Sequence, residues 1–150
     1  MRSVIIKMVL FIFISAAFLS FSVGLGGEGF EISVGNKVIF QKYGNQVNDV
    51  SKLQLDERSI NEQLIIKYHH CGRIGKNRVV TIKDIYNKVV KEWHFADDSM
   101  PVGAMNCSVR EILDLNTING PFKLYYSSTE LPNGRLLTGI IITKGKVARL

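Results

Sequence analysis

Three apolar runs rich in β-branched residues lie between residues 63 and 95, and two turn signals separate them. The runs at 63–71, 78–84 and 88–95 alternate apolar and polar residues, which is the period of a β-strand. Lys91 interrupts the face that Val89, Trp93 and Phe95 share, so we expect a bulge or an edge position there.

Similar short runs occur along the chain, with turn signals at a spacing of roughly 8–12 residues. The segment around 105–115 fits either a strand or a short helix, because Val109, Ile112 and Leu113 have helical spacing. About eight or nine short strands predict an all-β fold. We expect an antiparallel β-sandwich at residues 30–150, because regular strands need a core and protected edges.

The N-terminus has the layout of a secretory signal peptide. Arg2 and Lys7 precede an almost wholly apolar stretch at 8–21, and small residues follow at Ser22 and Gly24. A positive region, an apolar region and small residues near a cleavage point are typical of export signals.

This layout predicts three parts: an N-terminal signal helix at 1–22, a Gly-rich linker at 23–29 and the sandwich domain at 30–150. Residues 8–25 are also nearly long enough to span a bilayer as an uncleaved anchor. The expected location is secreted or periplasmic, in the cell envelope, with membrane contact only if the segment is uncleaved.

The formal net charge is +6, but the basic residues are scattered along the chain. Nucleic-acid binding needs clustered Lys and Arg with interleaved aromatic residues, so we expect no nucleic-acid partner. The expected partner is another envelope protein or a surface glycan.

The two cysteines, Cys71 and Cys107, lie in or next to predicted strands. Disulfides persist in an oxidising compartment, so we predict a structural Cys71–Cys107 bridge. Two free, buried thiols are the alternative, because cysteine also packs as a small apolar residue.

No motif in the sequence assigns a catalytic, cofactor or metal residue. His69 and His70 point to opposite faces of their predicted strand, and Asp97-Asp98 lacks the spacing of a calcium loop. No G-x-S-x-G nucleophile motif is present. We therefore expect no cofactor or metal, and favour a protein that is not an enzyme.

Tyr125 and Tyr126 are the candidate ligand-contact aromatics, because aromatic faces stack on sugars. They alternate along one predicted strand, so one of them should be exposed. Packing in the core or at its rim is the alternative role.

The motif VVTIKDIYNKVVKEWHF, followed later by STELPNGRLLTGIIITKGK, resembles the strand–turn–strand pattern of C-terminal sorting and adhesion-type β-sandwich modules in secreted proteins of Bacteroidetes. Asn87 replaces the usual turn glycine, and Arg135 replaces an aromatic residue. The resemblance implies an envelope or secreted location.

These features predict a small exported β-sandwich that acts as a non-catalytic binding or structural module in the cell envelope or outside the cell. Two alternatives remain. One is a secreted enzyme whose site assembles only in the fold, and the other is a membrane-tethered accessory subunit.

Overall fold

The structure is a computed structural model that describes residues 27–97, 99–117 and 120–143. The predicted signal helix at 1–22 and most of the linker lie outside the described residues. Within them, nine strands form two sheets, with one short α-helix, α2 (Val109–Leu113), and three 3-10 turns. None of the helices in the described part is long and apolar enough to cross a membrane.

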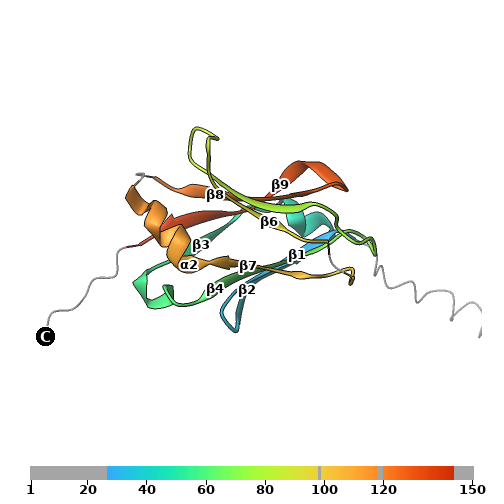
Figure 1. Cartoon of the computed structure of the whole chain (residues 1–150), viewed down its shortest axis with the longest axis horizontal. Helices are drawn as coiled ribbons and strands as arrows, with labels where there is room; N and C mark the ends of the chain where they lie inside the picture. The colour runs from blue at the N-terminus through green and yellow to red at the C-terminus, as the bar shows by residue number, and fades with distance from the viewer. Residues whose placement is uncertain (1–26, 98, 118–119, 144–150) are drawn as a thin grey trace, which may run out of the picture.

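The two sheets lie over one another as two layers (Figure 1). The four-stranded sheet has the order β2 (Lys37–Tyr43), β1 (Gly29–Val34), β4 (Gln63–His69), β7 (Ala104–Ser108). The five-stranded sheet has the order β3 (Ser51–Leu55), β9 (Leu131–Ile142), β8 (Phe122–Ser128), β5 (Arg78–Lys83), β6 (Val89–Phe95).

One strand pair departs from the antiparallel arrangement that the sequence predicted. β3 runs parallel to β9, with Ser51 opposite Thr138 and Leu55 opposite Ile142. These two strands are 87 residues apart, so their relative direction is set by the whole chain path and not by a local turn. The other strand pairs are antiparallel.

Alternate residues of the central strands fill the space between the sheets. This is the alternation that the sequence pattern predicts for strands with one buried face. The fully buried residues from the two sheets include Phe30, Ile32, Leu64, Ile66, Met105, Val80, Ile82, Leu124, Tyr126 and Ile140.

The prediction for Lys91 is confirmed. β6 is the edge of the five-stranded sheet, and the β5–β6 register shifts next to the Ile82–Lys91 pair. Trp93 and Phe95 pack against the core but are only partly buried, because an edge strand has a neighbour on one side.

The segment that fitted either a strand or a helix contains both. β7 ends at Ser108, and α2 follows at once and buries Val109 and Ile112. Glu111 of α2 accepts a hydrogen bond from Trp93 Nε1 (3.0 Å), which ties the helix to β6.

Candidate functional site

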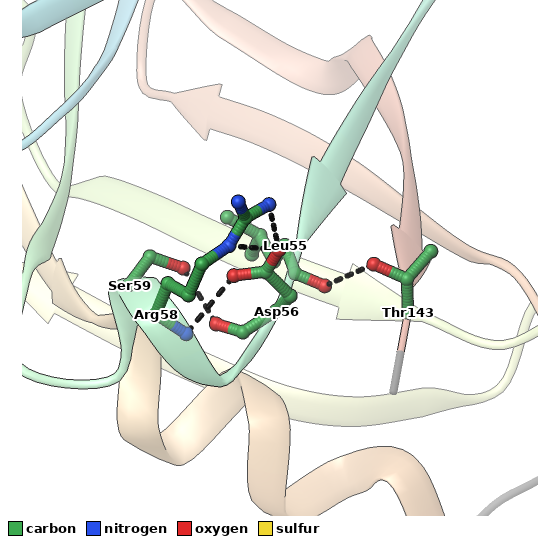
Figure 2. Close-up of polar contacts among 5 residues, drawn as sticks. All are labelled: Leu55, Asp56, Arg58, Ser59 and Thr143. Atoms are coloured by element: carbon green, nitrogen blue, oxygen red, sulfur yellow. Dashed lines mark hydrogen bonds and ion pairs between the residues drawn. The ribbon is translucent and has the colours of Figure 1, made fainter. Parts of the chain in front are cut away.

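A groove of about 750 Å³ lies beside β3. We call it the β3 groove. Its walls come from β3, from the β1–β2 hairpin and from the short 3-10 turn η2 (Glu57–Ser59). Figure 2 shows the η2 end, where β3 finishes.

The β3 groove follows the edge of the strand and not one of its faces. Five consecutive residues, 52–56, line it. Successive side chains of a strand point to opposite faces, so a recess over one face would contact alternate residues. β3 pairs only with β9 among the described strands, so its other edge is unpaired and borders the groove.

The backbone at this edge is available for hydrogen bonding. Leu55 O accepts from the backbone N–H of Thr143 at 2.9 Å, so Leu55 directs its backbone groups toward β9. Backbone direction alternates along a strand that pairs on one side. Lys52 and Gln54 therefore direct their N–H and C=O groups into the groove, where they present two donors and two acceptors.

The opposite wall is irregular and carries apolar side chains. Val34 and Ile39 line it and pack against the core. Ile32 pairs with Phe40 and Ser33 with Val38, so Ile39 is the extra residue of a β-bulge. The bulge disrupts the ladder at the edge of β2. The regular hydrogen-bonding edge of the groove is therefore that of β3.

The η2 end of the groove is held by a local polar network (Figure 2). Asp56 caps η2, accepting from Arg58 N (2.9 Å) through Oδ1 and from Arg58 Nε (2.9 Å) through Oδ2. The hydrogen bond from the Arg58 side chain lowers the pKa of Asp56. Ser59 Oγ donates to Asp56 O at 2.8 Å, and Thr143 fixes the preceding carbonyl. This network forms the η2 end of the groove, where Asp56, Arg58 and Ser59 line it.

Two lysines of the groove are available to a ligand. Lys37 and Lys52 are exposed and have no ion-pair partner among the described residues, whereas Arg58 is paired with Asp56 at 2.5 Å. Glu62, on the far wall, is the one acidic lining residue besides Asp56. The groove can hold an extended segment through its backbone and favours acidic side chains beside the two lysines.

A second, buried polar cluster lies at the other end of the sheets. His70 Nε2 is 2.8 Å from Tyr126 Oη and 3.3 Å from Ser128 Oγ. Tyr68 stacks on Tyr126 with the ring centroids 4.5 Å apart. A cavity of about 230 Å³ opens beside His70.

Burial shifts the pKa values of the titratable side chains in this cluster toward their neutral forms. It lowers the pKa of His70 and raises the pKa of both Tyr68 and Tyr126. A neutral imidazole that accepts at Nε2 fits the two neighbouring hydroxyl donors, Tyr126 and Ser128.

The cluster lacks the arrangement of a nucleophilic site. Ser128 and His70 are each only 5% exposed, and Ser128 does not line the cavity beside His70. Glu28 is engaged by Arg135 Nη2 at 2.5 Å and accepts from Tyr68 Oη at 3.3 Å. The arrangement joins β4, β8 and β9.

The described residues contain no group of three or more His, Cys, Asp or Glu side chains placed to hold a metal ion. Asp97 instead accepts a hydrogen bond from Asn77 N at 2.8 Å, and Asp98 lies outside the described residues.

The predicted Cys71–Cys107 disulfide is absent, and both cysteines are free. Cys107 lies opposite Leu64 at one end of β4, whereas Cys71 follows the other end of that strand. Seven residues of extended chain separate Leu64 from Cys71, which is roughly 20 Å. A bridge requires Cα atoms within about 7 Å. The alternative prediction was two free, buried thiols. Both thiols are free, and Cys107 is buried, but Cys71 is exposed.

The two tyrosines alternate as predicted. Tyr126 is fully buried, so it cannot contact an external ligand. Tyr125 is partly exposed on the outer face, where Lys83 Nζ lies 4.5 Å from the ring centroid. The structure does not bring either tyrosine to the β3 groove.

No protein-family model matches this chain, and a search of curated proteins finds no match. The resemblance to sorting and adhesion modules stays an expectation.

The groove residues were not singled out from the sequence. The run at 51–56 predicts a strand, and Lys52 is a residue type typical of edges. Which strand pairs with it, and on which side, depends on the position of β9.

Proposed function

We propose that this protein is a small exported β-sandwich and a non-catalytic binding module of the cell envelope. It binds an extended segment of a partner protein by adding that segment to the free edge of β3. The observation that carries the proposal is the β3 groove, which runs along an unpaired strand edge and is lined by five consecutive residues.

Strand addition uses the chemistry that this edge offers. Main-chain hydrogen bonds supply affinity, and pockets for alternate side chains supply specificity. The groups of Lys52 and Gln54 provide the backbone partners. A five-residue strand spans about 17 Å, so the ligand segment is about five residues long. Lys37 and Lys52 favour a segment that carries Asp or Glu.

Two of the three other sheet edges, β6 and β2, carry features that hinder strand addition. β6 has the inward-pointing Lys91, and β2 has the bulge at Ile39. Inward charges and bulges are common ways of protecting an edge. β3 has a regular register along all five residues. The contrast favours β3 over β6 and β2, and the groove distinguishes β3 from β7, which is also a regular edge strand.

Export is the second part of the proposal and rests on the basic, apolar and small residues of the first 24 positions. A secreted or periplasmic location gives the groove access to envelope proteins. N-terminal sequencing of the exported protein tests this part. A mature chain that starts near residues 23–28 supports it, and an intact Met1 in the membrane fraction supports the membrane-tethered alternative.

The groove is tested with Gln54→Pro and two matched variants. Proline removes the N–H that faces the groove but leaves the pairing with β9, since edge strands tolerate proline on the free side. Gln54→Ala keeps the N–H. Leu53→Pro removes an N–H that pairs with β9, so it should unfold the sheet edge.

The probe is an array of seven-residue peptides in which valine alternates with aspartate or threonine. NMR should show shifts at the Lys52 and Gln54 amides with the best binder. Binding should disappear in Gln54→Pro and persist in Gln54→Ala. Binding that survives Gln54→Pro, or an array without any binder at 1 mM, would refute the strand-addition site.

A further inference from the structure

The hairpin between β5 and β6 carries an exposed apolar tip. Ile85 is 45% exposed, Tyr86 83% and Val89 48%. Figure 1 shows this yellow-green hairpin projecting beyond the body of the two sheets. We call residues 84–89 the β5–β6 tip.

Hydrogen bonds within the turn fix the backbone conformation of the tip. Asp84 Oδ1 accepts from the backbone N–H groups of Tyr86 and Lys88, each at 2.9 Å. Asp84 N in turn donates to Lys88 O at 2.9 Å, and Asn87 adopts a left-handed φ of 63°. The turn therefore holds Ile85 and Tyr86 outward without help from a ligand.

Three lysines surround the apolar residues. Lys83 and Lys88 flank the turn in the sequence, and Lys123 Nζ donates to Asn87 Oδ1 at 2.9 Å. Asp84 is the one acidic residue of the segment 83–89, and its Oδ1 is used by backbone donors. The tip thus combines an apolar point with an excess of positive charge.

The C-terminal end of β9 lies at the same end of the molecule as the β5–β6 tip. Lys123 pairs with both Lys83 and Gly139, so β9 leaves its sheet at the end that carries the tip. Three basic residues follow in the sequence, Lys144, Lys146 and Arg149. β1 starts at the opposite end, where Gly29 pairs with His69.

We infer that the β5–β6 tip is a contact site for an anionic membrane surface. Ile85 and Val89 enter the boundary between headgroups and acyl chains, and Tyr86 places its ring there with the hydroxyl toward water. Lys83, Lys88 and Lys123 remain at the headgroups and attract the negative lipids. This contact does not depend on the strand-addition groove or on an N-terminal anchor.

The experiment uses the full chain with a single tryptophan reporter at the tip. Tyr86→Trp is combined with Trp93→Phe, and the matched control places the tryptophan at the exposed Val50 in the same background. The vesicles contain phosphatidylcholine alone or with one quarter phosphatidylglycerol, and brominated acyl chains quench a tryptophan that enters the bilayer.

Anionic vesicles should quench the tip reporter and leave the Val50→Trp reporter unquenched. Lys88→Gln and Lys123→Gln should each weaken binding about fivefold, and Ile85→Ser should reduce quenching. Lys37→Gln, in the β3 groove, is the charge-matched control and should bind as the parent does.

Three results would overturn the inference. Equal quenching at both reporters would show that another part of the chain holds the vesicle. Equal binding to neutral vesicles would remove the role of the lysines. Polyglutamate binding at the tip, without quenching by any vesicle, would assign the surface to an acidic protein.

Discussion

His70 Nε2 lies 2.8 Å from Tyr126 Oη, and this contact joins the end of β4 in one sheet to β8 in the other. Both residues are buried, and the Tyr68 ring stacks on the Tyr126 ring. Only the neutral imidazole can accept a hydrogen bond from the Tyr126 hydroxyl at Nε2, so this hydrogen bond between the sheets depends on the protonation of His70.

The first prediction is that the protein loses stability as the pH falls below about 6.5. Burial lowers the pKa of His70 in the folded state, while the negative charges of Glu130 and Glu28 oppose this shift. The unfolded chain therefore binds more protons between the lowered pKa and 6.5, and the free energy of unfolding decreases across that window. Urea unfolding at pH 7.5, 6.5, 5.5 and 5.0 measures the effect.

His70→Gln should flatten the pH dependence between pH 6.5 and 5, and the exposed His94→Gln should retain it. Asp56 and Glu111 do not interfere, because hydrogen bonds from Arg58 and Lys91 lower their pKa values and they titrate below this window. A slope that is the same in His70→Gln and the parent would contradict the assignment.

The second prediction compares a central strand with an edge strand. Ile66 is fully buried in β4, so Ile66→Ala should cost about 2–5 kcal/mol. Trp93 keeps part of its surface in solvent, so Trp93→Ala should cost less than the 3–5 kcal/mol typical of a buried aromatic residue. Chemical denaturation gives both values. A Trp93→Ala loss as large as that of a buried aromatic would show that β6 is covered in solution.

The third prediction concerns the thiols of the purified, unreduced protein. Cys71 is exposed and should react with a thiol reagent in the native state. Cys107 is fully buried, and burial raises its pKa to about 12, so it should react only after unfolding. We expect one reactive thiol in the native protein and two in denaturant. If no thiol reacts in denaturant, the two cysteines form the disulfide that the sequence predicted.

The sequence predicted the features that depend on neighbouring residues. Alternation in β4 and β5 identified the buried faces of Leu64 and Val80, and the charge of Lys91 marked an edge. These features follow from the two-residue period of a strand and need no knowledge of the partner strand.

The disulfide prediction was wrong and the groove was not predicted, because both depend on which strands pair across long stretches of sequence. The predicted Cys71–Cys107 bridge is wrong because the β4–β7 register places Cys107 opposite Leu64, at the end of β4 that lies away from Cys71. The β3 groove exists because β9 occupies one edge of β3 and nothing in the described residues occupies the other. Register and pairing of remote strands are properties of the complete fold, and one-dimensional patterns do not contain them.

The parallel pairing of β3 with β9 also constrains when the fold can form. Thr138 follows Ser51 by 87 residues, so β3 gains its one neighbour among the described strands only when β9 is present. Closing so long a loop is entropically costly, and contacts of this separation slow folding. Until β9 is synthesised, neither edge of β3 has a partner among the described strands. A truncated chain that lacks β9 would expose two template edges in place of one, and that makes it prone to aggregation.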